Sequence, residues 1–174
     1  MLIIGIDPGI SGAIAAVTPS GRLEWVQDMP VRDAGKKNRK AHEIDGVALG
    51  RMLRVQLVDI SEVWIEEVSA MPGQGVSSMF GLGDSRGCIR GVCEALGLSV
   101  QRVHPRKWKK AYALNSDKDA SRAHAVRLYP GCEALQRKKD HGRAEAILLA
   151  RYGALQSLLG ESFLEQAPKL ELVA

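Results

Sequence analysis

The amino-terminal part of the chain alternates short apolar runs with turn residues. Leu2–Ile6 is apolar and rich in β-branched residues, and it ends at the turn signal Asp7-Pro8-Gly9. Gly12–Val17 is a second apolar run, and Arg22–Gln27 alternates apolar with polar residues after a turn at 18–21. Three strands joined by two turns predict an antiparallel meander.

Strand and helix patterns alternate in the middle of the chain. After a polar, basic loop at 30–40, apolar spacing predicts a helix over Glu43–Val58. A strand at 62–66 is followed by a Gly- and Ser-rich segment that runs into a helix between Val76 and Leu96, and then by a strand at 98–103.

The carboxyl-terminal part has helical patterns only. We expect a short basic helix around Trp108, a helix through Leu128 with Ser116 as its N-cap, and a last helix over Asp140–Leu159. This order predicts one α/β domain over residues 1–160, a mixed five-stranded sheet flanked by helices, followed by a C-terminal tail at 161–174.

Composition narrows the class of protein. The 174 residues are 45% hydrophobic, enough for a core, and no apolar run reaches 18 residues, so we expect no membrane span. The amino terminus lacks the basic lead-in of a signal peptide. Cys88, Cys93 and Cys132 form no CxxC pair, which argues against a zinc site or disulfide framework and predicts a cytoplasmic location.

Positive charge is concentrated in one segment. Between Arg102 and Arg143, twelve Lys and Arg residues face four acidic ones, a balance of +8, although the whole chain carries only +4. Such an asymmetry favours a face that binds a polyanion over a merely solvated surface.

Acidic residues stand at the ends of three predicted elements. They are Asp7 after the first strand, Glu66 and Glu67 at the end of the fourth, and Asp140, His141 and Glu145 at the start of the last helix. Strand ends of an open α/β sheet are where ligands usually bind. Several carboxylates meeting there suit Mg²⁺ or Mn²⁺, and two such ions hold both the attacking and the leaving oxygen of a phosphodiester displacement.

Spacing limits which of these side chains can meet. Strand alternation places Glu66 and Glu67 on opposite sides, so at most one of them can join Asp7. His141 and Glu145, four apart, share one helical face, whereas Asp140 can join them only from a non-helical N-cap position. Each residue also has a plain structural alternative: a turn for Asp7, a cap for Asp140 and solvated surface for the rest.

An ordered set of segments resembles RuvC-type Holliday-junction resolvases over about residues 2–153. The similar segments are Ile4-Gly5-Ile6-Asp7-Pro8-Gly9, Ile65-Glu66-Glu67-Val68, 77–83 with Arg86-Gly87, His104-Pro105 with Lys109 and Lys118, and Gly142-Arg143-Ala144-Glu145-Ala146 followed by 147–150. The chain looks more like a divergent phage member than the common bacterial enzyme. It departs from the family at Gly142, where an acid or His is usual, and in the loop 70–75.

The resemblance implies a ribonuclease-H-like fold, a homodimer, and metal-dependent symmetric nicking of four-way DNA junctions. It implies that Asp7, Glu66 and Glu145 bind two Mg²⁺ or Mn²⁺ ions at each site, with Asp140 or His141 as the remaining ligand. The expected DNA-binding residues are Arg106, Lys107, Lys109, Lys110, Lys118, Arg122, Lys138, Lys139 and Arg143. The expected dimer contacts are Met79, Phe80, Leu82, Ile89 and Val92.

Three other functions compete with junction resolution. Another ribonuclease-H-like nuclease, acting on other branched DNA or on an RNA–DNA hybrid, would use the same site. An ATP-binding domain of the actin and Hsp70 kind also opens with a Gly-x-Asp-x-Gly strand, but it needs a far longer chain. A non-catalytic DNA-binding module would have no need of the full set of carboxylates.

Overall fold

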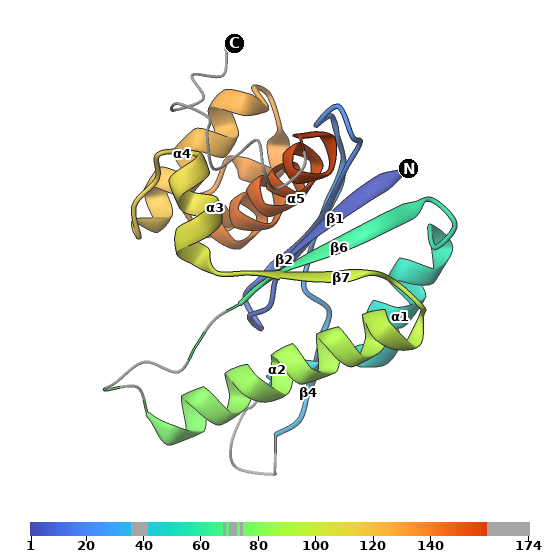
Figure 1. The fold of residues 1–174 in the computed structure, drawn as a ribbon. Coiled ribbons are helices and arrows are strands. Elements are labelled where there is room, and N and C mark those ends of the chain that lie inside the picture. Colours follow the sequence, from blue (N-terminus) through green and yellow to red (C-terminus); the bar gives the residue numbers. More distant parts are fainter. Residues whose placement is uncertain (36–41, 68, 70–72, 74, 160–174) are drawn as a thin grey trace.

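A five-stranded sheet forms the centre of the structure, a computed structural model that describes residues 1–35, 42–67, 69, 73 and 75–159. In order across the sheet (Figure 1), its strands are β3 (Leu23–Asp28), β2 (Ala13–Val17), β1 (Leu2–Asp7), β6 (Ile60–Glu66) and β7 (Val100–Val103). β1 and β2 are antiparallel, as are β2 and β3, whereas β6 runs parallel to both β1 and β7. The predicted meander and mixed sheet are confirmed.

Helices cover both faces of the sheet (Figure 1). One face carries α3 (Pro105–Ala111), α4 (Lys118–Leu128) and α5 (His141–Leu159), and is called the α5 face below. The other carries α1 (Gly46–Val55) and α2 (Val76–Ala95), and is called the α2 face. Two single-turn 3₁₀ helices, η1 (Glu133–Leu135) and η2 (Lys138–Asp140), lead from α4 into α5.

Part of the predicted loop at 30–40 is a strand, which corrects the sequence interpretation. β4 (Val31–Asp33) pairs antiparallel with β5 (His42–Ile44), and Arg32 bonds Glu43 across the pair at 2.6 Å. The first helix therefore starts later than predicted, at Gly46, because the Asp45 carboxylate caps it by accepting from the Ala48 N–H at 2.9 Å. β4 and β5 are short, polar and largely exposed, so they lack the apolar alternation that marks a strand.

One further helix start differs from the prediction. Asp117, rather than Ser116, is the N-cap of α4, and its carboxylate accepts from the Asp119 N–H at 2.9 Å. The tail at 161–174 and the loop residues 36–40 lie outside the described residues. Within the described ranges, no helix combines the length and apolar content needed to cross a membrane.

Strand alternation separates two cores. Ile4 and Ile6 of β1 and Val63 and Ile65 of β6 pack on the α2 face, together with the buried Ile89 of α2. The core of the α5 face contains Ala13, Ala15, Val103, Trp108 and a run of buried residues at 144–152 of α5. From Ala144 to Ala150 every residue of α5 is buried, which explains why this helix has no clear polar stripe in the sequence.

Gly5 of β1 lets α5 lie directly on the strand. A Cβ at this position would be 2.3 Å from both the Ala146 carbonyl oxygen and the Ala150 nitrogen, which are backbone atoms and cannot rotate away. The small side chains of Ala146 and Ala150 also allow α5 to lie close to β1. The position of α5 relative to the sheet therefore depends on glycine at residue 5.

We predict that Gly5→Ala destabilises the protein by about 3 kcal/mol or more, because overpacking against backbone forces α5 away from β1. Gly50→Ala is the matched control. It lies in the middle of α1, and its added Cβ would meet Val92 at an ordinary 3.7 Å. The control should be stabilised by about 0.5–1 kcal/mol through helix propensity. Urea denaturation measures both changes, and similar midpoints for the two variants would contradict the packing argument.

Candidate active site

Asp7 and Glu66 meet at the carboxyl ends of two parallel strands. In β1, Ile3 and Gly5 contact α5, so alternation places Asp7 on the α5 face. In β6, Trp64 packs edge-on against Tyr152 of α5, so Glu66 lies on the same face. Because Ile6 pairs with Ile65 in the parallel register, Asp7 and Glu66 are the next residues on neighbouring strands.

Glu66 is a buried carboxylate beside two other acids. Its side chain accepts a hydrogen bond from the Trp108 indole N–H at 3.0 Å, and the residue is only 9% exposed. Burial, followed by the negative charges of Glu145 and Asp7, raises the pKa of Glu66 to about 7. The indole hydrogen bond and Lys109 oppose this rise without cancelling it. The three acids therefore interact strongly.

Glu145 on the second turn of α5 is held by two neighbouring helices. The Lys109 ammonium of α3 donates to its Oε1 at 2.7 Å, and the Ser121 hydroxyl of α4 donates to the same oxygen at 3.3 Å. Both side chains of the ion pair are largely buried, at 14% and 9% exposure. Lys109, expected from the sequence to contact DNA, thus contributes its charge inside the acidic site.

Gly142 marks the closest approach of α5 to Asp7. A Cβ there would lie 3.3 Å from the Asp7 Oδ2 and 2.7 Å from the Ser11 carbonyl oxygen. Any side chain at this position would therefore point at Asp7, although glycine supplies no ligand. His141 is the first residue of α5 and shares a helical face with Glu145, so it remains the predicted fourth group.

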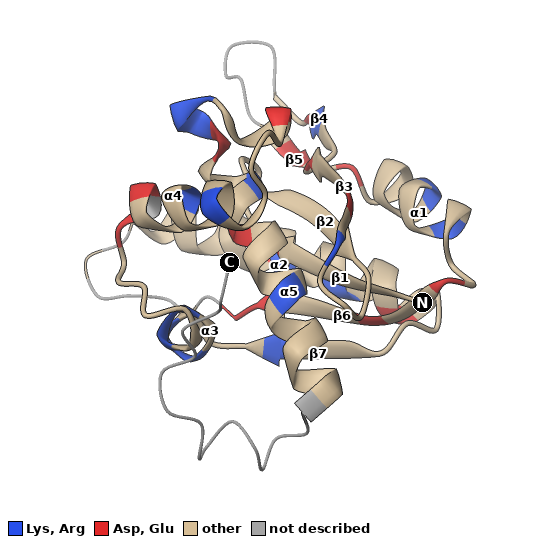
Figure 2. Ribbon diagram, turned by 90° about the horizontal axis from the view of Figure 1, so that it is seen from above, with Lys and Arg blue, Asp and Glu red and all other residues tan. Residues whose placement is uncertain are grey.

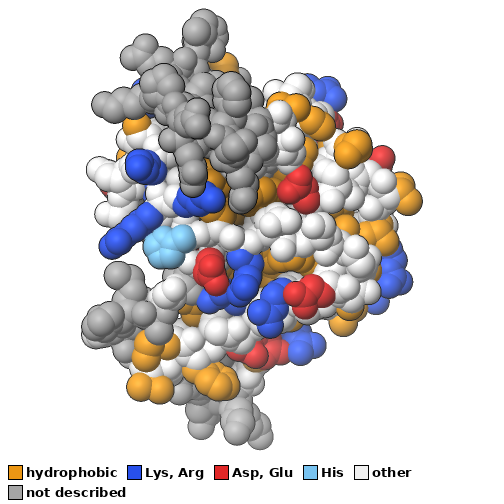
Figure 3. All heavy atoms as spheres, viewed as in Figure 1, with side chains coloured by type: hydrophobic (Ala, Val, Ile, Leu, Met, Phe, Trp, Pro, Cys, Tyr) orange, Lys and Arg blue, Asp and Glu red, His pale blue; other side chains and the backbone are white. Residues whose placement is uncertain are grey.

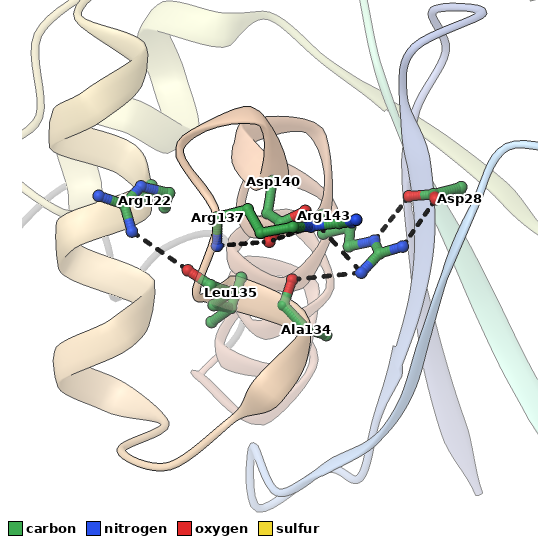
Figure 4. Close-up of polar contacts among 7 residues, drawn as sticks. All are labelled: Asp28, Arg122, Ala134, Leu135, Arg137, Asp140 and Arg143. Atoms are coloured by element: carbon green, nitrogen blue, oxygen red, sulfur yellow. Dashed lines mark hydrogen bonds and ion pairs between the residues drawn. The ribbon is translucent and has the colours of Figure 1, made fainter.

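Asp140 belongs to a different group of charges (Figure 4). Its carboxylate accepts from the Arg137 backbone N–H at 2.8 Å and from the Arg137 guanidinium at 2.7 Å. Arg143 lies 3.9 Å from Asp140 and forms a bidentate pair with Asp28 of β3, with both bonds at 2.6 Å. Arg137 lowers the pKa of Asp140, as Arg143 lowers that of Asp28. This group ties the start of α5 to β3, and a metal-binding role for Asp140 stays a prediction.

Glu67 points away from the three acids, as strand alternation predicts. Its Oε1 lies 3.7 Å from Arg86 of α2 and 3.4 Å from Arg102 of β7, both on the α2 face. Glu66 and Glu67 therefore belong to opposite faces of the sheet. Of the two acids, Glu66 is the one placed with Asp7.

The donor set suits a hard divalent cation. Lys109 binds one of three neighbouring carboxylates, and burial, followed by the charges of Glu145 and Asp7, raises the pKa of Glu66. In the part of the chain that is described, no three His, Cys, Asp or Glu side chains are already arranged to hold a metal ion. Trp108 binds one oxygen of Glu66, and Lys109 binds one oxygen of Glu145. Metal binding would exchange these bonds for the ion.

The basic residues expected to bind DNA fall into two groups by their contacts; Figure 2 marks the positions of Lys and Arg along the ribbon. Exposed side chains on α3 and η2 could meet a polyanion, and they belong to Arg106, Lys107, Lys110, Lys138 and Lys139, of which Lys138 lies 3.6 Å from Asp119. Arg122 instead donates to the Leu135 carbonyl oxygen at 3.1 Å, and Arg143 pairs with Asp28. The side chain of Lys118 lies outside the described residues. DNA contact stays a prediction for all of them.

Two functional neighbours were missed in the sequence. Ser121 carried no signal, because a serine in a helix is ordinary and its contact with Glu145 depends on how α4 packs against α5. Trp108, in the predicted short basic helix, is buried at 1% exposure, and its indole also positions Glu66. A buried tryptophan usually finds a partner for its N–H, and that rule could have suggested an acidic neighbour.

Comparison of this chain with known proteins finds a relative by sequence and solved structures with a similar fold. No protein-family model matches the chain. The chain is 35% identical over 92 residues to the chloroplastic Holliday junction resolvase MOC1 of Chlamydomonas reinhardtii. The matched segment is 51% of this chain but 10% of that protein, so the chain spans about a tenth of its relative's length.

Solved structures match nearly the whole chain. RuvC of T. thermophilus in complex with a Holliday junction substrate superimposes with a TM-score of 0.67 at 19% identity, covering 92% of this chain and 96% of that one. A second Thermus thermophilus RuvC structure gives a TM-score of 0.58 at 18% identity, with 92% and 97% coverage. The chain therefore has the ribonuclease-H-like fold of RuvC, as the resemblance implied.

We predict that Glu66→Gln stabilises the metal-free protein at high pH. In the unfolded chain this carboxyl ionises near pH 4.5, whereas in the folded protein it stays protonated up to about pH 7. The folded state therefore loses stability as the pH rises between these values, by up to about 3 kcal/mol. Glutamine removes the buried charge and keeps an acceptor for Trp108.

Thermal unfolding with a chelator checks this prediction. The gain of Glu66→Gln over the unsubstituted protein should be large at pH 8 and absent at pH 4.5. Glu67→Gln, which removes a carboxylate from the opposite face, is the control and should show no pH-dependent gain. An equal effect of Glu66→Gln at both pH values would mean that the carboxylate is not desolvated in solution.

Proposed function

We propose that this protein is a structure-selective endonuclease that resolves four-way DNA junctions by symmetric nicking. The observation that carries the proposal is the meeting of Asp7, Glu66 and Glu145 at the carboxyl edge of a RuvC-like sheet. The sequence relative supports the same function, since that protein is named a Holliday junction resolvase. No other described feature favours a different activity to the same extent.

Mg²⁺ or Mn²⁺ is the proposed cofactor, with two ions at each site. Asp7, Glu66 and Glu145 would hold them, and His141 is the closest additional candidate on the same face of α5. When bound, such ions stabilise the charge that develops on the attacking and leaving oxygens of a phosphodiester.

The surrounding residues prepare the site for this role. Trp108 fixes one oxygen of Glu66 through its indole N–H, which limits the rotation of that carboxylate. Lys109 and Ser121 hold Glu145 in the same way. The Asp28–Arg143 pair and the Arg137–Asp140 pair fix the first turn of α5, which carries His141. The carboxylates are thus oriented before any ligand arrives.

The DNA would lie across the carboxyl edge of the sheet. Exposed lysine and arginine side chains of α3 stand beside the site, since Lys109 of the same helix reaches Glu145. Lys138 and Lys139 extend this basic surface at η2. Backbone phosphates on both sides of the cut would meet these side chains. Such phosphate contacts do not depend on the base sequence of the DNA.

A two-fold dimer is part of the proposal. One copy offers one acidic site, whereas a four-way junction has approximate two-fold symmetry and needs two nicks. Phe80 on α2 is 79% exposed and Val76 is 78% exposed, so this helix offers an apolar surface for a second copy. Met79, Leu82 and Val92 are only partly available and Ile89 is fully buried, so Phe80 is the main expected contact among the five.

A reducing cytosol is the proposed compartment. Cys88, Cys93 and Cys132 are all free thiols in the structure. Burial raises the pKa of Cys93 to about 12, which keeps this thiol unreactive inside the core. The stability of the fold does not depend on oxidation.

We predict that the protein cuts a synthetic four-way junction in the presence of Mg²⁺ and that Asp7→Asn and Glu145→Gln abolish cutting. Removing one ligand should lower the rate at least 100-fold while junction binding persists, because phosphate contacts come from the separate basic surface. A panel of four-way, Y-shaped, linear duplex and RNA–DNA hybrid substrates, with and without metal, measures the specificity.

Two results would overturn this function. Preferential cutting of the hybrid or the Y-shaped substrate would indicate another ribonuclease-H-like nuclease. Junction binding with no cutting by the unsubstituted protein, under any of the metals tested, would indicate a DNA-binding module without catalysis.

We predict a dimer in solution that Phe80→Glu converts to a monomer, because a charge cannot be buried in an isologous apolar contact without a partner. Val58→Glu is the control, since Val58 is 95% exposed in the turn after α1 and should leave the dimer intact. Sedimentation velocity at micromolar concentration distinguishes the two states. A monomeric unsubstituted protein, both free and on a junction, is incompatible with paired nicking.

A further inference from the structure

A cavity of about 220 Å³ opens between α2 and β7 at the carboxyl end of β6. It is several times larger than the roughly 30 Å³ that one water molecule takes up in the liquid. We call it the arginine pocket. Its polar and glycine lining consists of Arg86, Arg90, Arg102, Gly83, Gly87 and Glu66.

Three guanidinium groups from two elements converge on this pocket. Arg86 and Arg90 are one turn apart on α2, and Arg102 pairs in register with Ile65 of β6, so its side chain leaves the sheet on the α2 face. Figure 3 shows basic and acidic side chains next to one another over the seam between α2 and β7. A guanidinium presents a planar fork of donors that matches the oxygens of a phosphate.

The ion pairs that these arginines form with Glu67 and Glu94 are long. Arg86 and Arg102 approach Glu67 at 3.7 and 3.4 Å, and Arg90 approaches Glu94 at 3.7 Å. By contrast, the structural pair of Arg143 with Asp28 is bidentate at 2.6 Å. Long pairs between partly exposed side chains exchange readily for a stronger anion.

Glycine keeps the wall of α2 open at this point. A Cβ at Gly83 or Gly87 would have no atom of the described residues within 4 Å, so these residues leave the space beside the helix backbone open. Glu66 borders the pocket, although its carboxylate lies on the α5 face with Trp108. The pocket and the acidic site therefore lie on opposite faces of the sheet at the same end of β6.

We propose that Arg86, Arg90 and Arg102 form a phosphate subsite. This subsite holds a backbone phosphate of the DNA that lies beside the phosphate being cut. Glu67 is the internal anion that this phosphate displaces. The assignment to DNA rests on the proposed function, whereas the affinity for a phosphate group follows from the pocket itself. Arg86, Arg90 and Arg102 are positioning residues, since they fix the strand without touching the reacting atoms.

The first test measures junction binding against salt concentration, in a chelator so that no strand is cut. Arg86→Gln and Arg102→Gln should each weaken binding and lower the slope of log K against log salt by about 0.9 if the phosphate belongs to a duplex arm, or about 0.7 if it belongs to a single strand. Arg22→Gln is the matched control, because Arg22 precedes β3 at the opposite edge of the sheet and should leave the slope unchanged. Unchanged slopes for both pocket variants would overturn the subsite.

Glu67→Gln gives a result of the opposite sign. If Glu67 competes with the phosphate, its removal should tighten junction binding several-fold. If Glu67 only holds the arginines in place, its removal should weaken binding. Weaker binding by Glu67→Gln would therefore contradict the displacement.

The second test uses inorganic phosphate and no DNA. The arginine Nε–Hε resonances of the full chain, assigned with the same variants, are followed as phosphate is added. Saturable shifts at Arg86 and Arg102 but not at Arg22 are expected. Equal shifts at all arginines would overturn the subsite even if the protein cuts junctions. Selective shifts in a protein that neither binds nor cuts a junction would overturn the proposed function and the assignment to DNA, but not the anion site.

Discussion

The contact between α5 and β1 is the constraint on which the rest of the structure depends. Gly5 brings the backbone of α5 against the strand, and Gly142 brings its first turn against Asp7. A side chain at position 5 would meet the backbone of α5 and push the helix, with Glu145, away from Asp7 and Glu66. A packing requirement in the core thus sets the spacing of the acidic groups.

That spacing has an electrostatic cost, which the neighbouring helices reduce. Glu66 is held among Asp7, Glu145 and apolar side chains, where its charged form is disfavoured. α3 supplies the compensating groups, because Trp108 donates to Glu66 and Lys109 to Glu145. The same short helix also carries exposed cations at Arg106, Lys107 and Lys110. Site support and a basic surface therefore come from one basic segment, in which neighbouring residues point in different directions.

Much of this arrangement could be predicted from the sequence, because it follows from periodicity. Alternation along β6 separated Glu66 from Glu67, and the order of apolar runs gave the five strands and their mixed direction. The β4–β5 pair could not be found in the same way, since each strand has three residues and Ile44 is the buried one among the six. Asp140 shows a second limit. Its position near Glu145 at the start of the last helix suggested a metal ligand. Its contacts with Arg137 depend on a 3₁₀ turn that the sequence pattern does not predict.

The two adjacent acids at the end of β6 connect the two faces of the sheet. Glu66 faces α5 with the other carboxylates, and Glu67 pairs with the arginines of the α2 face. A strand of DNA that crosses this edge would meet negative charge on one side of Glu66 and positive charge on the other. A bound cation would make the first side attractive to phosphate, whereas the second needs no cation. If a second copy binds at the exposed Phe80, α2 would carry both the contact between copies and two of the pocket arginines. This helix would then link the contact between copies to the path of the DNA, as α5 links the packing of the core to the position of the acids.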